Sequence, residues 1–407
     1  MSAFVSLIDR FARDPSESIM DELIKMAKQN EICDEDIAYL ALTMAESGSV
    51  ITFHELGSVA DIASTGGPSS LSTLLCPLFL QSFGYIVPKL GVPGRPAGGI
   101  DVLAQIPGYQ YELDALQIKD IISNSGYAHF LTSNKHAPLD AILFGFRKSH
   151  GALNIPALGI ASILSKKKAF GVRLVGLDVR VSPYNNFGST RQSAREHAMQ
   201  FCRVAKLIGY RAVCFLTDNV APYQPFIGRG ESLLALSLIF QGQAPEWLQN
   251  HVDLCFAMAR KLTNNDLELS SGPPALKTDI PDLFVKNIEA QGASFESFME
   301  YVTRISKGHT YELLSKKEGF FFVDLGKLRE ILTSIQSISA CDTTPLVDPC
   351  GVILKKAPGQ YVKKGDLLAS VRMNVKLETD LLRLLGDSLM VRQDFHAELF
   401  FEEVKDE

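Results

Sequence analysis

The chain has 407 residues, of which 46% are hydrophobic and 21% are charged, and its formal net charge is −6. This composition is typical of a globular protein with two or three domains, and the acidic balance argues against a nucleic-acid-binding protein that depends on phosphate contacts. No apolar run approaches the roughly 20 residues that span a membrane, and charges interrupt the apolar pattern of the N-terminal segment, so we expect neither a membrane helix nor a signal peptide.

The cysteines and histidines form no metal-binding or disulfide pattern. Seven cysteines and eight histidines are present, without a C-x-x-C pair or an H-E-x-x-H motif. Most of the cysteines lie in apolar surroundings, which is typical of reduced thiols. We therefore expect a cytoplasmic protein without a metal site.

The first 55 residues are expected to form a small helical unit. Apolar residues recur at helical spacing in three segments, 2–12, 18–30 and 34–47. A unit of this size cannot bury all of its apolar faces alone, so we expect it to pack on later parts of the chain.

Two glycine-rich turns, at 64–67 and 91–99, bracket a Ser/Thr cluster and an apolar helix-like run at 74–80. Glycines let a backbone approach an anion closely, and hydroxyls and the free N–H groups of a helix N-terminus supply hydrogen-bond donors. The two turns can therefore form opposite walls of an oxyanion or sugar-phosphate site. The alternative interpretation is that these glycines only make tight turns between strands and helices.

Two helix-like segments follow, at 137–153 and 155–170. In the second, Ser162 and Lys166 lie one helical turn apart and can both reach a single planar polar ligand. The alternative interpretation is a solvated lysine-rich helix end that suits the helix dipole.

From residue 172 onward the sequence alternates between strand and helix patterns. Strands are predicted at 172–182 and 211–218 with a helix between them, which indicates a mostly parallel sheet with helices on its faces. Ligands bind such sheets at the carboxyl ends of the strands, where Asp218, Asn219 and the turn at 228–230 would lie. The segment 318–335 is expected to return one strand to this sheet. After about residue 341, short alternating runs predict a small antiparallel β unit.

These patterns predict an α/β protein. It consists of a small helical domain (1–55 and 137–170), a larger domain with a mostly parallel sheet flanked by helices (56–136 and 171–335), and a small C-terminal β-rich unit (336–407).

The chain resembles the thymidine (pyrimidine-nucleoside) phosphorylase family along nearly its whole length. The loop QPFIGRGESLLAL is most similar to the branch of that family that uses nucleoside monophosphates. The most specific motifs are D-x-x-S-T-G-G at 61–67, VPK followed by G-x-P-G-R and a glycine pair at 98–99, IPGY at 106–109, APLDAILFGFR ending at Arg147, ASILSKK at 161–167, and LDVRV at 177–181.

This resemblance implies a pentosyltransferase that catalyses the reversible phosphorolysis of a pyrimidine nucleoside or nucleoside monophosphate to the free base and a sugar 1-phosphate. Inorganic phosphate is then the co-substrate, and no other cofactor is expected. The resemblance also implies a homodimer formed through the helical unit, whose apolar faces include Leu7 with Phe11 and Leu23 with Met26. Neither a membrane nor a nucleic acid is expected as a partner.

The resemblance also implies the roles of individual residues. Arg147, Ser162 and Lys166 correspond to the family's base-binding residues, and Arg147 and Lys166 would stabilise negative charge on the departing base. The phosphate-binding residues would be Ser64, Thr65, Gly66, Gly67, Ser72 and Thr73.

The chain departs from the family at the phosphate site. The family has D-K-H-S-T-G-G, whereas this chain has Ile62 in place of the phosphate-contacting lysine and Ala63 in place of the histidine. Losing a cation there should weaken anion binding by a few kcal/mol. Lys89, Arg95 or Arg229 could replace it from another wall.

Two alternative functions follow from these departures. The segment at 61–67 is also similar to anthranilate phosphoribosyltransferases, which would imply transfer from phosphoribosyl pyrophosphate with Mg²⁺. Against this, the central α/β part has no adjacent Asp-Glu pair that could hold a metal-bound pyrophosphate. The other alternative is a non-catalytic nucleoside- or nucleotide-binding protein that has lost the phosphate-binding Lys and the His.

Overall fold

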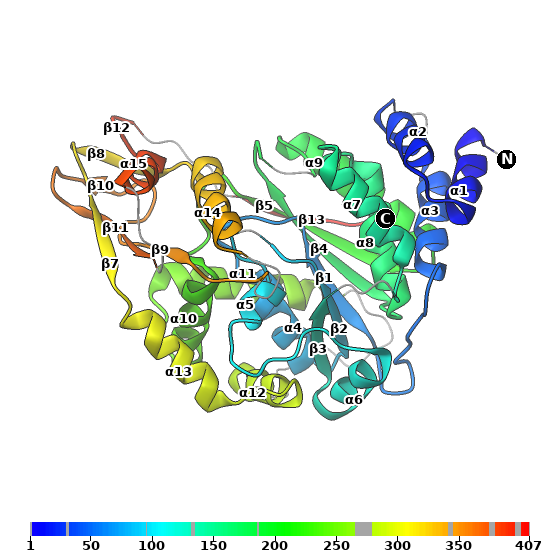
Figure 1. Ribbon diagram of the computed structural model, residues 1–407, viewed down its shortest axis with the longest axis horizontal. Helices are drawn as coiled ribbons and strands as arrows, with labels where there is room; N and C mark the ends of the chain where they lie inside the picture. Colours follow the sequence, from blue (N-terminus) through cyan, green and yellow to red (C-terminus); the bar gives the residue numbers. More distant parts are fainter. Residues whose placement is uncertain are drawn as a thin grey trace.

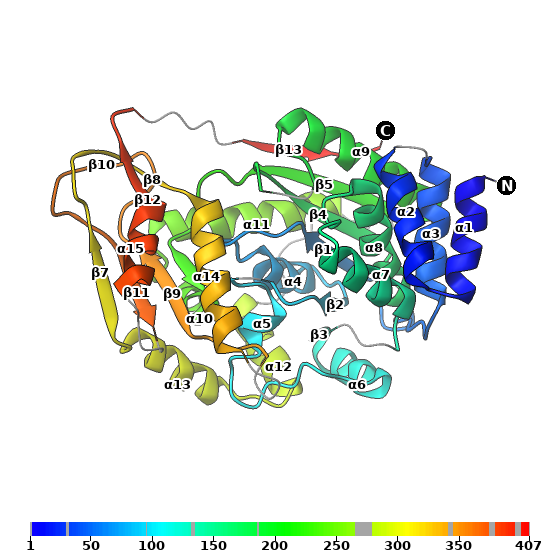
Figure 2. The same cartoon turned by 45° about the horizontal axis from the view of Figure 1, so that its top comes forward.

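Figure 1 shows the computed structural model of the chain, with helices and strands labelled in chain order. The structure describes residues 2–29, 32–94, 96–131, 135–184, 187–264, 279–340, 345–373, 379–394 and 400–406. In both views a group of helices lies at one end of the molecule and a group of short strands at the other, with the central sheet between them (Figures 1 and 2).

The helical end combines the N-terminal helices with two helices from the middle of the chain. Leu7 and Phe11 are at most 2% exposed because α1 packs against α2 and α3, and Leu23 on α2 is 0% exposed. In turn, α3 packs against α8, and α2 packs against α7 and α8. The predicted packing on later parts of the chain is confirmed. These side chains are covered within one chain, so they give no support to a dimer, which stays a prediction. The helices are α1 (Ala3–Arg13), α2 (Glu17–Lys28), α3 (Asp34–Glu46), α7 (Pro138–Ser149) and α8 (Pro156–Ala169).

A four-stranded sheet forms the centre of the molecule, in the order β1-β4-β5-β13. β1 pairs with β4, and β4 with β5, in parallel, as predicted; β13 pairs antiparallel with β5. Every residue of β4 is buried, because helices cover both faces of the sheet: α9 lies on one face, and α4 and α11 on the other. The elements are β1 (Ala60–Ser64), β4 (Leu174–Val181), β5 (Arg211–Asp218), β13 (Phe401–Val404), α4 (Ser72–Ser82), α9 (Arg191–Leu207) and α11 (Glu246–Asn264).

The prediction that the segment 318–335 returns a strand to this sheet is wrong. That strand, β8 (Gly319–Val323), pairs antiparallel with β10 (Tyr361–Val362) and β12 (Leu389–Arg392) in a separate sheet. Its residues alternate between buried and partly exposed, which suits a sheet covered on one face and not one sandwiched between helices. The C-terminal strand β13 takes the place beside β5 instead.

The second glycine-rich turn follows a separate parallel strand pair, β2 (Val87–Gly91) with β3 (Tyr127–Leu131). The short helix α5 (Ile100–Leu103) continues from this turn, and α6 (Ala115–Ser125) connects it to β3. A bridge between Val59 and Ile86 brings the pair next to β1. The two glycine-rich turns therefore begin at the ends of neighbouring strands.

The C-terminal part is antiparallel, as predicted, but its strands form two sheets. One is β10-β8-β12 and the other is β6-β9-β11-β7. Strands β6, β7 and β8 come from before residue 336, so both sheets combine segments from the two sides of the predicted boundary; the domain boundaries themselves stay a prediction. The remaining elements are β6 (Phe226–Gly228), β7 (Thr310–Leu314), β9 (Cys350–Leu354), β11 (Leu367–Met373), α10 (Arg229–Phe240), α12 (Ile280–Ala290), α13 (Phe295–Ser306), α14 (Leu325–Ser339) and α15 (Thr379–Ser388). None of the helices described is long and apolar enough to cross a membrane.

Candidate functional site

A cavity of about 280 Å³ lies where the glycine-rich stretch meets α7 and α8. Ser64 at the end of β1 and Gly91 at the end of β2 both line it, so it lies at the carboxyl ends of parallel strands, where ligands of α/β proteins usually bind. Gly66, Gly67 and Ser72 do not line it. The predicted site residues that do are Ser64, Thr65, Thr73, Arg147, Ser162 and Lys166.

Ser162 and Lys166 form one polar wall of the cavity on α8. The Lys166 ammonium donates to Ser162 Oγ at 2.8 Å and to the Ser162 carbonyl at 3.1 Å, as their one-turn spacing allows. The ammonium also forms an ion pair with the buried carboxylate of Asp140 on α7. This pair fixes the charged end of Lys166 beside the cavity, next to the ring of Phe144, whose centroid lies 5.6 Å away.

Arg147 holds the connection between α7 and α8. Its Nε donates to the Ala152 carbonyl at 3.2 Å, Nη1 to Leu158 at 3.1 Å and Nη2 to Leu153 at 3.2 Å. Burial lowers the pKa of Arg147 to about 10, so the guanidinium remains charged at neutral pH. A guanidinium has five N–H donors, and these bonds use three of them. One N–H on each terminal nitrogen has no acceptor among the residues that the structure describes.

The first glycine-rich turn needs glycine for conformational reasons. Gly66 has φ of 97° and Gly67 has φ of 153°, values that residues with a Cβ rarely adopt. In this turn the Gly66 N–H donates to Ser64 Oγ at 3.2 Å. Thr65 Oγ1 accepts from the Arg180 N–H at 3.0 Å, which leaves its own hydroxyl hydrogen available. The turn thus presents two hydroxyls, those of Ser64 and Thr65, at the cavity.

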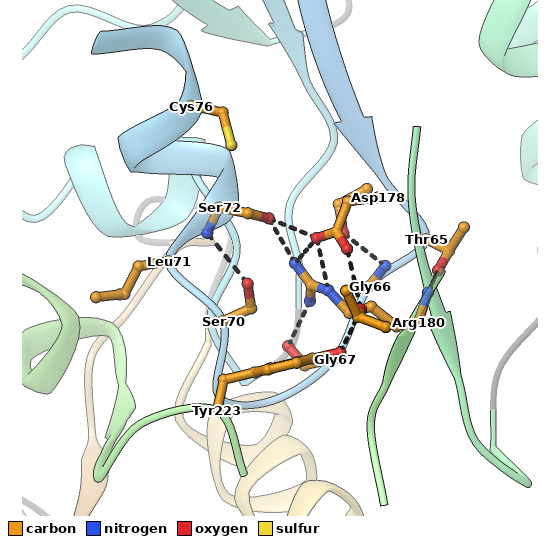
Figure 3. Close-up of polar contacts among 12 residues, drawn as sticks. Thr65, Gly66, Gly67, Ser70, Leu71, Ser72, Cys76, Asp178, Arg180 and Tyr223 are labelled. Atoms are coloured by element: carbon orange, nitrogen blue, oxygen red, sulfur yellow. Dashed lines mark hydrogen bonds and ion pairs between the residues drawn. The ribbon is translucent and has the colours of Figure 1, made fainter. Parts of the chain in front are cut away.

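Ser72 belongs to a separate buried network behind this turn, shown in Figure 3. Its hydroxyl donates to Asp178 Oδ2 at 2.7 Å and accepts from Arg180 Nη2 at 2.8 Å. Arg180 also donates from Nε to Asp178 Oδ2 at 3.0 Å and contacts the Gly67 carbonyl at 3.4 Å. Of these two predicted phosphate-binding hydroxyls, Thr73 lines the cavity, whereas Ser72 is hydrogen-bonded within the protein.

A buried carboxylate between two ammonium groups lies beneath the cavity. Asp61 is fully buried, accepts from Lys89 Nζ at 2.7 Å and forms an ion pair with Lys167. Lys89 also donates to the Ile62 carbonyl at 2.6 Å. Burial disfavours the charged carboxylate, but Lys167 and Lys89 outweigh it and lower the pKa of Asp61 to about 2. Both lysines line the cavity, so the trio presents a net positive charge to it.

The three residues proposed to replace the family lysine lie in different places. Lys89 reaches the cavity, although it is paired with Asp61. Arg229 does not line the cavity: its Nε donates to the buried Asp101 at 3.0 Å, and Asp101 accepts from the Gly94 and Gly98 N–H groups of the second glycine-rich turn. Arg95 lies outside the residues that the structure describes.

Ile62 and Ala63 are the two residues that differ from the family motif, and their side chains point in opposite directions. Ile62 is 1% exposed and packs into the apolar cluster under α4 and α11, whereas Ala63 lines the cavity. This follows from the alternation of side chains along a strand. A longer residue at position 63 would therefore extend into the cavity, and one at position 62 would extend into the core.

His129 on β3 also lines the cavity and was not a sequence-based candidate. The Tyr127 hydroxyl bonds its Nδ1 at 2.9 Å, and burial, with a further contribution from Lys89, lowers the pKa of His129 well below the usual value. A Cβ at Gly99 would lie 2.3 Å from His129 Cε1, so glycine is required there for close approach. An isolated histidine in an apolar strand gives no spacing signal, which is why the sequence did not reveal it.

The cavity as a whole favours an anion or an electron-rich ligand. Its lining includes four cationic side chains, those of Lys89, Arg147, Lys166 and Lys167. Two buried carboxylates, Asp61 and Asp140, pair with three of these cations, which leaves an excess of two positive charges. Within the ranges given above, no group of three or more His, Cys, Asp and Glu side chains comes together as a metal site would require.

No protein-family model matches the chain. Among solved structures, anthranilate phosphoribosyltransferase from Thermus thermophilus superposes with a TM-score of 0.47 at 17% identity, covering 75% of this chain and 100% of that chain. The Saccharomyces cerevisiae enzyme in complex with PRPP and Mg gives 0.46 at 10% identity, covering 75% of this chain and 92% of that chain.

Curated proteins give a match over most of the sequence. The pyrimidine-nucleoside phosphorylase of Staphylococcus epidermidis is 23% identical over 373 residues, covering 89% of this chain and 86% of that protein. The protein of the same name from Staphylococcus haemolyticus is 25% identical over 379 residues, covering 88% of this chain and 85% of that protein. The chain is thus similar along 88–89% of its length to pyrimidine-nucleoside phosphorylases, which confirms the family resemblance that its motifs indicate.

Proposed function

We propose that this chain is a pentosyltransferase that binds a pyrimidine nucleoside or nucleoside monophosphate in the cavity at the ends of β1 and β2 and transfers the pentosyl group to inorganic phosphate. One observation carries the proposal: the Ser162–Lys166 wall and the hydroxyls of Ser64, Thr65 and Thr73 line the same cavity. A base and an anion can therefore be bound together in this cavity, with the sugar between them.

In the proposed reaction, a phosphate oxygen attacks C1′ of the pentose as the bond between C1′ and the base nitrogen breaks. The electron pair of that bond remains on the base, which becomes negatively charged. Lys166 and the two unused N–H groups of Arg147 are suited to stabilise this charge, because their positions are fixed by Asp140 and by backbone carbonyls. The positive excess of the Asp61, Lys89 and Lys167 trio would attract the phosphate.

A non-catalytic nucleoside-binding protein is the second candidate, and a specific observation favours it. The side chain at position 62 faces the core, and Lys89 and Lys167 are both paired with Asp61. The phosphate would then bind through hydroxyls and a partly neutralised charge, without the direct lysine contact that the family motif provides.

The discriminating experiment incubates the protein with a panel of nucleosides and nucleoside 5′-monophosphates, with phosphate, without phosphate, or with phosphoribosyl pyrophosphate and Mg²⁺. Free base that forms only with phosphate supports the proposal. A reaction that requires the pyrophosphate donor would indicate a phosphoribosyltransferase. Ligand binding without turnover would indicate a non-catalytic nucleoside-binding protein.

The base wall is tested by Ser162→Ala, with Ser165→Ala as a matched control on the same helix. Ser165 is buried, does not line the cavity, and donates to the Ser162 carbonyl at 3.0 Å. Ser162→Ala should weaken pyrimidine nucleoside binding about tenfold, the equivalent of 1.4 kcal/mol, while Ser165→Ala should leave affinity unchanged. Calorimetry that finds equal affinities for both variants would contradict this wall as the base site.

A further inference from the structure

A second cavity, of about 550 Å³, lies beyond the carboxyl end of β5. None of its lining residues lines the cavity of the candidate site. Its walls come from the loop after β5, from α11, from the turn at 357–358 and from the start of β13. We call it the aromatic pocket and define it by Asp218, Ala221, Tyr223, Trp247, His251 and Phe401.

Flat aromatic side chains form much of this pocket. Tyr223, Trp247 and Phe401 line it together with His251, whose ring stacks on that of Tyr223 with centroids 5.3 Å apart. Rings of this kind bind planar ligands by stacking, and concave apolar walls with a few polar groups are typical of small-molecule sites. Trp247 is the only tryptophan in the sequence, which gives the pocket its own optical reporter.

His251 carries a hydrogen-bond donor that has no acceptor among the described residues. It is 3% exposed, and its Nε2 accepts from the Leu71 N–H at 2.8 Å. Burial, together with Arg180, lowers the pKa of His251 to about 3, so the ring is neutral. A neutral imidazole that accepts at Nε2 carries its proton on Nδ1. That Nδ1 is buried and has no hydrogen-bond partner among the residues described, although buried polar groups nearly always have one.

Asp218 supplies an acceptor on the same pocket. It ends β5, and its Oδ1 accepts from the Val220 N–H at 2.9 Å, an arrangement that holds the carboxyl group in place. A carboxylate has two oxygens with about four acceptor positions, so it retains acceptor capacity toward the pocket. The pocket thus combines aromatic walls with a donor, His251 Nδ1, and an acceptor, Asp218, the two kinds of group that a ring carbonyl and a ring N–H require.

We propose that the aromatic pocket is a second ligand site, which binds an uncharged planar lactam heterocycle of the kind found in uracil, thymine and hypoxanthine. The ring stacks against the aromatic walls and its N–H donates to Asp218. Its carbonyl accepts from His251 Nδ1 once the entering ring has displaced the atoms that cover this nitrogen. This site is separate from the cavity proposed for pentosyl transfer, and it does not depend on that function.

The test is a fluorescence titration of the whole protein, with selective excitation of Trp247. Uracil and hypoxanthine are the probes, and 1,3-dimethyluracil, which keeps the ring but has no N–H, is the matched control. Uracil or hypoxanthine should change the Trp247 emission in a saturable way, and dimethyluracil should bind at least tenfold more weakly than uracil. No saturable change with either probe, or equal affinity for uracil and its dimethyl form, would overturn the proposal.

Two variants establish where the signal arises. Ala221→Leu narrows the pocket and should weaken the fluorescence response at least tenfold, whereas Ser162→Ala, in the other cavity, should leave it unchanged. A response that survives Ala221→Leu, or one that disappears with Ser162→Ala, would refute the assignment. His251 is not substituted because it also bonds Leu71 at the start of α4. The dimethyluracil comparison and the Ser162→Ala variant do not depend on the Leu variant. A response that requires the ring N–H and survives Ser162→Ala therefore supports the proposal even if the Leu variant does not fold.

Discussion

Replacing Asp61 by asparagine should destabilise the folded chain strongly, because it removes the countercharge of two buried ammonium groups. Asp61 is 0% exposed and lies 2.7 Å from Lys89 Nζ, with Lys167 on its other oxygen. Asparagine has nearly the same size, so no cavity forms. Breaking a buried ion pair by removing one partner typically costs about 3–5 kcal/mol.

The pKa of Asp61 gives an independent magnitude for the stability that its ionised carboxylate contributes. Its folded-state value of about 2 lies below the ordinary 3.8, so ionised Asp61 contributes stability above pH 4 that is lost as the pH falls toward 2. A shift of this size corresponds to about 2 kcal/mol. The stability difference between the natural chain and Asp61→Asn should therefore be largest near neutral pH and should narrow by about 2 kcal/mol between pH 4 and pH 2.

Urea denaturation at several pH values measures this difference. Asp253→Asn is the control, since Asp253 is an exposed carboxylate that accepts from Gln249 at 2.8 Å, and its loss should change stability by less than about 0.5 kcal/mol. Phosphate should stabilise Asp61→Asn more than the natural chain, because the two lysines are then unpaired beside the cavity. A loss below about 1 kcal/mol at pH 7 would refute the reasoning, because it would mean that the buried lysines need no countercharge.

Three further predictions concern individual side chains. Ile62→Lys should lower the unfolding free energy by at least about 2 kcal/mol, because the new ammonium enters the apolar core. Ala63→His should be tolerated, because its side chain extends into the cavity. Equal stability of the two variants would contradict the directions assigned to these two side chains. Thr73→Val should raise the KM for phosphate about tenfold with little loss of stability. Ser72→Ala should leave this KM unchanged and lower the unfolding free energy in urea denaturation by about 1–3 kcal/mol. The opposite pattern would place Ser72 at the anion. Arg147→Lys should lower the unfolding free energy by about 2–4 kcal/mol through lost bonds to three carbonyls, and an unchanged thermal midpoint would show that the guanidinium does not hold this connection.

Local patterns in the sequence predicted much of the architecture. The parallel pairing of β4 with β5 follows from two apolar strands separated by an amphipathic helix, and the proximity of Ser162 to Lys166 follows from helical spacing. The positive φ values of Gly66 and Gly67 are likewise expected from a turn that only glycine adopts readily. These features depend on residues close together in the chain, so a single sequence carries enough information to predict them.

Contacts between distant segments were decided by the tertiary structure alone. Lys166 and Lys167 are neighbours in one lysine run, yet one pairs with Asp140 and the other with Asp61, which is 106 residues away. Arg229 turned out to support the second glycine-rich turn through Asp101, and the central sheet gained β13 and not the predicted strand β8. Such pairings depend on strand order and on which side of a strand or helix faces the core. Local propensity and spacing do not specify these, because the free energy of each pairing comes from burial between segments that are far apart in the chain.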